Sequence, residues 1–166
     1  DGVDPTTELG KSIPEINYPI TSDAFFELIK GHDIKYDIIF IDGLHHSDQV
    51  NKDIDNALNH LVDNGIIVLH DCNPLVELFT KVPRQSEANP FCVYKSVLHF
   101  RQKSPHKVIT VDDDCGCGVI FNNVLENNKC SVNDLIQGIE SWEFFDKNRN
   151  QLLNLISVDE FKASYQ

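Results

Sequence analysis

Apolar residues in this chain gather in short blocks, and the spacing within each block predicts its secondary structure. Residues 36–41 form an apolar, β-rich run without period-2 alternation, which is typical of a strand covered on both faces. Ser47 is a suitable N-cap, and the apolar positions between 50 and 62 have helical spacing up to a stop at residues 63–65. Residues 66–69 are a second buried strand. Strand, helix and strand in this order predict a right-handed βαβ unit.

The flanking segments predict further elements. Upstream, residues 17–20 resemble the end of a strand. Ser22 or Asp23 is expected to cap a short helix, and Gly31 is placed to close it. Downstream, residues 74–90 carry three prolines and predict a long loop, a candidate lid or substrate loop. A helix over residues 91–102 is expected to follow.

The C-terminal part of the pattern predicts an antiparallel pair and a helical tail. Residues 107–111 and 118–121 are strand-like, and the short connection between them requires antiparallel pairing. Ser131 is expected to cap one helix, and a second helix carries apolar positions from Trp142 to Ile156. Ser157 and Glu160 have capping-box spacing. No linker interrupts the chain, so we expect a single domain over residues 1–166 with a helical tail at 131–163.

Composition and charge exclude several classes of protein. The 166-residue chain is 41% apolar, enough for one domain with a core, but no stretch approaches the roughly 18 to 20 apolar residues of a membrane span. Its 26 acidic and 14 basic side chains give a formal net charge of -12. That charge repels phosphate backbones and anionic lipid head groups. We expect neither nucleic acid nor a membrane as a partner.

The five cysteines are odd in number and irregularly spaced, so they do not predict a disulfide framework. A reducing, cytoplasmic location fits this pattern best. Cys115 and Cys117 resemble half of a metal knuckle. They lack the usual two-residue spacer and a second pair, so we do not favour a metal site there.

Three acidic residues are predicted at the carboxyl ends of strands, where ligands gather in open α/β sheets. Asp4 would follow one strand, Asp42 ends the strand at 36–41, and Asp71 ends the strand at 66–69. Adjacent parallel strands lie about 5 Å apart, so neighbouring strands would let Asp42 and Asp71 face a common cation. His45 lies close by in the sequence and is a candidate general base or metal ligand.

Each of these residues also has an ordinary structural interpretation. Asp42 can be a turn carboxylate that caps the next helix, and a tandem histidine at a helix entrance is often polar surface. We favour that second interpretation for His46. Strand alternation predicts that His70 points away from Asp71 as a satisfied core group. Residues 112–114 are most simply a solvated acidic turn.

Several segments resemble class I S-adenosylmethionine-dependent methyltransferases. They are Gly2-Val3-Asp4-Pro5, Thr21-Ser22-Asp23-Ala24-Phe25-Phe26, residues 36–45 and residues 64–71. The similarity continues through residues 93–95, 116–120 and 150–157, so it spans nearly the whole chain. Each motif alone is weak, but their order and spacing are fairly specific. The chain is most similar to a small bacterial branch linked to sugar or surface-polysaccharide modification.

The resemblance implies a Rossmann-like sheet, mostly parallel with an antiparallel C-terminal strand, and roles for several residues. Asp4 matches the carboxylate that holds the cofactor ribose, Asp23 matches the adenine contact, and Asp42 is also assigned to the cofactor site. Several oxygen methyltransferases of this fold bind a divalent cation, Mg²⁺ or Mn²⁺, at positions matched by Asp42 and Asp71. His45 would take the proton from a hydroxylated small molecule or sugar. The oligomeric state, a homo-oligomer included, stays open.

The chain also departs from this family at its beginning. The family's first strand and Gly-rich loop would lie before Asp1, so we expect the sequence to be a fragment of a longer protein with an exposed apolar sheet edge and low stability. Two other hypotheses remain. One is a truncated, non-catalytic Rossmann-like module, and the other is a nucleotide-sugar or dinucleotide enzyme with the same sheet.

Overall fold

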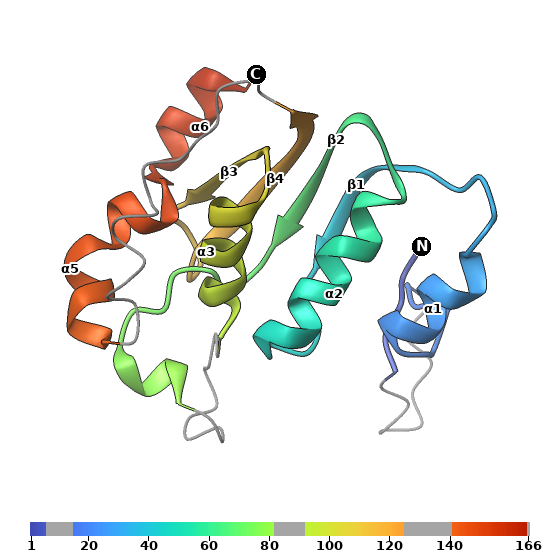
Figure 1. Cartoon of the computed structure of the whole chain (residues 1–166), viewed down its shortest axis with the longest axis horizontal. Coiled ribbons are helices and arrows are strands. Elements are labelled where there is room, and N and C mark those ends of the chain that lie inside the picture. The colour runs from blue at the N-terminus through green and yellow to red at the C-terminus, as the bar shows by residue number, and fades with distance from the viewer. Residues whose placement is uncertain (6–14, 82–91, 125–140, 166) are drawn as a thin grey trace. The chain divides into compact units, whose positions relative to one another are not determined.

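The computed structural model describes residues 1–5, 15–81, 92–124 and 141–165, which form two compact units, Asp1–Lys35 and Tyr36–Gln166 (Figure 1). The first unit holds α1. The elements are α1 (Ser22–Ile29), β1 (Tyr36–Ile41), α2 (Ser47–Leu58), β2 (Leu61–Leu69), the 3₁₀ helix η1 (Glu77–Thr80), α3 (Val93–Lys103), β3 (His106–Val111), β4 (Cys117–Val124), α5 (Trp142–Leu153), β5 (Leu155–Ile156) and α6 (Val158–Ser164). No helix within the described ranges is long and apolar enough to cross a membrane.

The N-terminal unit contains an isolated parallel bridge and one helix. Val3 pairs in parallel with Tyr18, and the backbone N–H of Asp4 donates to the Tyr18 carbonyl at 3.2 Å. The helix α1 is capped by Thr21, whose hydroxyl accepts from Ala24 N–H at 3.2 Å, so the prediction of Ser22 or Asp23 as the cap is wrong by one or two positions. Thr21 has the extended backbone that an N-cap requires.

The second unit is built on a five-stranded sheet in the order β1-β2-β4-β3-β5. β1 and β2 are parallel, as are β3 and β5, whereas β4 runs antiparallel to both β2 and β3. Four strands therefore point one way and β4 points the other. This confirms the mixed, mostly parallel sheet and the predicted antiparallel pair, and it is consistent with a Rossmann-like methyltransferase fold.

The hydrophobic core lies between one face of this sheet and the helices α2 and α3, which contact each other across it (Figure 1). Ile67 and Ile120 are paired neighbours on that face and are fully buried, as are Ile54 of α2 and Val97 of α3. On the opposite face, α6 covers the β3 and β4 side: its Phe161 packs against a cluster of Ile109, Val111 and Val119.

The part of this opposite face that lies over the edge strand β1 is exposed. Ile38 and Phe40 are 61% and 60% exposed. The prediction that this strand is covered on both faces is wrong for Tyr36–Gln166 as the structure describes it, because α6 packs only over the β3 and β4 side.

The boundary between α2 and β2 differs from the prediction. His46, not Ser47, occupies the N-cap position of α2, and Ser47 is its first residue. The helix ends at Leu58, and Leu61 pairs with Tyr36 as the start of β2 instead of extending the helix. Asn64 has a φ of +64°, and the β1–β2 register shifts beside it, so the residues expected to stop the helix form an irregular part of the strand.

The C-terminal elements follow the prediction with one change. Ile156 lies in the short strand β5 and not in α5, because Asn154 has a φ of +51° and ends the helix. The capping box of Ser157 and Glu160 at the start of α6 is confirmed. The predicted helix at 91–102 is observed as α3, and η1 lies within the expected loop at 74–90. Ser131 and residues 82–90 of the expected loop lie outside the described residues.

The difference between the two sheet faces predicts different costs for the same substitution. Ile67→Ala should lower the free energy of unfolding by about 2 to 5 kcal/mol because it leaves a cavity beneath α2 and α3. Ile38→Ala on the adjacent strand should change it by less than about 0.5 kcal/mol because the side chain is already in water. Urea unfolding of both variants measures this, and equal losses would show that the β1 face is covered.

Candidate functional site

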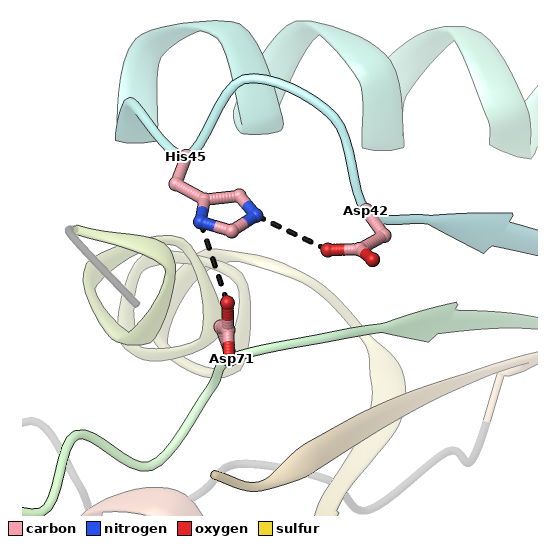
Figure 2. Close-up of side chains that lie close together, drawn as sticks. All are labelled: Asp42, His45 and Asp71. Atoms are coloured by element: carbon pink, nitrogen blue, oxygen red, sulfur yellow. Dashed lines mark hydrogen bonds and ion pairs between the residues drawn. The ribbon is translucent and has the colours of Figure 1, made fainter. Parts of the chain in front are cut away.

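Two carboxylates meet at the carboxyl edge of the parallel pair β1–β2. Ile41 and Leu69 form the last paired positions, and His70 N–H donates to the Ile41 carbonyl at 3.1 Å. Asp42 and Asp71 therefore leave the two strands side by side (Figure 2). The predicted parallel adjacency of the strands that end in Asp42 and Asp71 is confirmed.

His45 lies between these carboxylates. Its Nε2 is 3.1 Å from Asp42 Oδ1, and its Nδ1 is 3.4 Å from Asp71 Oδ2 (Figure 2). A carboxylate only accepts hydrogen bonds, so the ring donates to both only when both nitrogens carry protons. The two carboxylates fix the plane of the ring and share its positive charge in that state.

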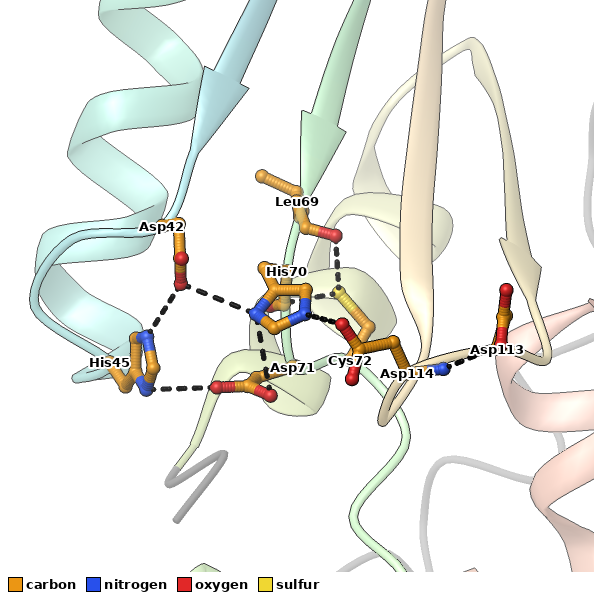
Figure 3. A network of polar contacts seen from close by, with 8 residues as sticks. All are labelled: Asp42, His45, Leu69, His70, Asp71, Cys72, Asp113 and Asp114. Carbon is orange, nitrogen blue, oxygen red and sulfur yellow. Dashed lines mark hydrogen bonds and ion pairs between the residues drawn. The ribbon is translucent and has the colours of Figure 1, made fainter. Parts of the chain in front are cut away.

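His70 closes the group from the other side. Its Nδ1 lies 3.4 Å from Asp42 Oδ1 and 3.5 Å from Asp71 Oδ1, and its Nε2 lies 3.2 Å from Asp114 Oδ2 (Figure 3). The prediction that His70 points elsewhere is therefore wrong. Asp71 has a φ of +58°, so the strand alternation behind that prediction ends at His70.

The loop that carries Asp42 and His45 is held by the start of α3. The backbone N–H of Cys92 donates to the His45 carbonyl at 3.1 Å, and the Ser96 hydroxyl donates to the Ser47 carbonyl at 3.2 Å. Ser96 is fully buried, so this bond is shielded from competing water. The position of the His45 ring is therefore tied to α3 as well as to the two carboxylates.

Burial and the neighbouring charges shift the pKa values of two of these groups. Burial raises the pKa of the Asp71 carboxyl, and the neighbouring carboxylates add to this effect while the two histidines oppose it. Burial alone would lower the pKa of His70, but the three surrounding carboxylates more than offset it, so the pKa lies above its usual value. The site thus favours a positive charge on His70.

The donor atoms fit a divalent cation. Asp42, His45 and Asp71 each offer one ligand atom, and these atoms lie within 4.8 Å of one another. Carboxylate oxygens suit Mg²⁺ and Mn²⁺, whereas an imidazole nitrogen is a more typical ligand of zinc, iron, nickel and copper. Asp42 is exposed, which leaves room for water or a substrate oxygen as further ligands.

The other residues considered from the sequence have different surroundings. Asp4 follows the Val3–Tyr18 bridge, and Asp23 lies in the first turn of α1, so both belong to the N-terminal unit and their cofactor roles stay predictions. Asp114 of the acidic turn contacts His70 and so belongs to the site. Neither Cys115 nor Cys117 belongs to a group of three or more potential ligands among the residues that the structure describes.

Part of the chain is similar to a known family of proteins. Residues 9–72 match a family described as a methyltransferase domain. The match covers less than half of the chain, but it includes Asp23, Asp42, His45 and Asp71. It supports a methyltransferase family for this protein, whereas the sugar-modifying bacterial branch stays a prediction. No curated protein matches the chain.

The raised pKa of His70 predicts how stability depends on pH in the metal-free protein. The unfolded-state value is about 6.5, and the protonated ring stabilises the fold fully below that pH. This stabilisation is lost as the pH rises through the higher pKa of the folded state. Urea unfolding in EDTA should give a free energy of unfolding that decreases as the pH rises across this range. In His70→Gln this decrease should be smaller. The exposed His99→Gln is the control, and an unchanged slope in His70→Gln would contradict the prediction.

Proposed function

We propose that this protein is an S-adenosylmethionine-dependent methyltransferase that methylates a hydroxyl oxygen of a small molecule or sugar with the help of a divalent cation. The observation that carries the proposal is the convergence of Asp42, His45 and Asp71 at the end of two parallel strands. The methyltransferase-domain match over the same residues supports it.

In this proposal, Asp42 and Asp71 hold Mg²⁺ or Mn²⁺. A cation held by these two carboxylates would lower the pKa of the acceptor hydroxyl and help to orient its oxygen toward the cofactor methyl. His45 accepts the hydroxyl proton on a ring nitrogen that has released its carboxylate contact. The remaining carboxylate keeps the ring in position, as partners of a catalytic histidine commonly do.

The N-terminal unit supplies the other residues proposed to bind the cofactor. Asp4 directly follows a parallel bridge, and a carboxylate at the end of a strand suits two vicinal ribose hydroxyls as a bidentate acceptor. Asp23, in the first turn of α1, is proposed to contact the adenine amino group. Asp42 is also proposed to contribute to the cofactor site. The free cysteines among the described residues accord with the proposed cytoplasmic location.

Cofactor binding is tested through Asp4. Asp4→Ala should weaken the binding of S-adenosylmethionine at least about tenfold, or roughly 1.4 kcal/mol. Calorimetry on the full-length protein measures this, and Asp33→Ala, an exposed position in the same unit, is the matched control. Equal affinity in Asp4→Ala and the control would remove Asp4 from the site. Binding of a dinucleotide instead would favour the dinucleotide enzyme.

The cation is tested without knowledge of the acceptor. The electron paramagnetic resonance signal of free Mn²⁺ should decrease when the ion is titrated into the protein and binds. In Asp71→Asn the free-ion signal should stay at full strength. Asp48→Asn, at the exposed start of α2, should bind Mn²⁺ as the unsubstituted protein does. Turnover of an identified acceptor should collapse in EDTA and return with Mg²⁺ or Mn²⁺. Full turnover in EDTA would exclude the cation and leave His45 as the base, which His45→Gln would then impair.

A further inference from the structure

The three residues that follow Asp71 are buried. Cys72 is fully buried, Asn73 is 3% exposed, and Pro74 is also buried, whereas Leu75 is 60% exposed. Asp71 itself has a φ of +58°, a conformation that residues other than glycine adopt at an energetic cost. Such a conformation persists only when its surroundings hold it, so this segment fixes where the Asp71 carboxylate points.

Arg149 of α5 makes polar contacts with residues 72–74, the buried segment that follows Asp71. One of its terminal guanidinium nitrogens, Nη1, donates to the Asn73 side-chain oxygen at 2.6 Å and to the Pro74 carbonyl at 2.9 Å. Its other terminal nitrogen pairs with Asp146, and the guanidinium lies over the rings of Trp142 and Phe145. The arginine head group is therefore itself held from several directions.

The β3–β4 turn holds the same segment from the other side. The Asn73 side-chain amide donates to Asp112 Oδ1 at 3.0 Å, and its backbone N–H donates to the Cys115 carbonyl at 2.6 Å. The Cys72 N–H donates to the Gly116 carbonyl at 2.8 Å. A Cβ on Gly116 would lie only 2.5 Å from Asn73 Cβ, so the turn and the segment are in close contact.

We propose that Arg149 is a positioning residue that acts through Asn73 and holds Asp71 in the conformation that directs its carboxylate at His45 and His70. The expected effect on cation binding rests on the proposed function. The expected effect on the conformation of residues 72–74 is independent of the proposed function, because it concerns hydrogen bonds of the metal-free protein.

A lysine at position 149 can replace this arginine only in part. One ammonium group is a compact charge without the planar face that lies over Trp142 and Phe145. It also lacks the second terminal nitrogen that pairs with Asp146 while the first donates to Asn73 and Pro74. Arg149→Lys should therefore retain only part of the effect, and Arg149→Gln should lose it.

The first test uses amide hydrogen exchange in EDTA. In Arg149→Gln, the amides of Cys72 and Asn73 should exchange at least about tenfold faster, with β1 and β2 amides unchanged. The control is Arg101→Gln, which removes a different arginine that donates to carbonyls of α5, at Gln151 and Leu152. Equal protection of Cys72 and Asn73 in Arg149→Gln and the control would overturn the proposal.

The second test uses Mn²⁺ affinity. Arg149→Gln should weaken binding at least about tenfold relative to Arg101→Gln, with Arg149→Lys between them. The double variant Arg149→Gln/Asn73→Ala should bind no worse than Asn73→Ala alone, because the two residues act in series. Fully additive losses would overturn the route through Asn73. If the unsubstituted protein binds no Mn²⁺, the proposed cation fails, while hydrogen exchange still decides the role of Arg149.

Discussion

The parallel pairing of β1 with β2 is the constraint on which the rest of the site depends. It places Ile41 beside Leu69, so the residues that follow, Asp42 and Asp71, leave the sheet at one edge. The same register puts Ile67 and Leu69 on the face covered by α2 and α3. A shift of one residue would turn these side chains to the opposite face and separate the carboxylates at the same time. Core packing and site geometry are thus fixed by one set of backbone hydrogen bonds.

The site gathers negative charge within a protein that is already strongly acidic. Asp42, Asp71 and Asp114 lie around two imidazoles. These carboxylates raise the pKa of His70 in spite of its burial, whereas the pKa of Asp71 is raised mainly by burial and further by the neighbouring carboxylates. A protonated His70 and a divalent cation are alternative ways of neutralising these carboxylates. His70 therefore contributes to the stability of the metal-free fold beside the site of the proposed chemistry.

The sequence predicted the elements whose signals are local. The apolar strand runs placed Asp42 and Asp71 at strand ends, and the spacing from Asp42 made His45 a candidate. His70 was missed because the prediction assumed regular strand alternation, which the left-handed Asp71 ends. The start of β2 was missed because Leu61 and Val62 continue the helical spacing of α2, and only pairing with β1 overrides that spacing. The contact of Arg149 with Asn73 joins residues 76 positions apart and has no local signal.

The contact between Arg149 and Asn73 also sets an order for the assembly of this protein. Contacts between residues far apart in the chain form late, because closing the long loop between them costs conformational entropy. During synthesis, β1 and β2 leave the ribosome with Asp42 and Asp71 long before α5 has been made. The nascent chain therefore carries Asp42 and Asp71 for some time without the arginine that we propose to position Asp71. The site reaches its final form only after Arg149 of α5 has been translated.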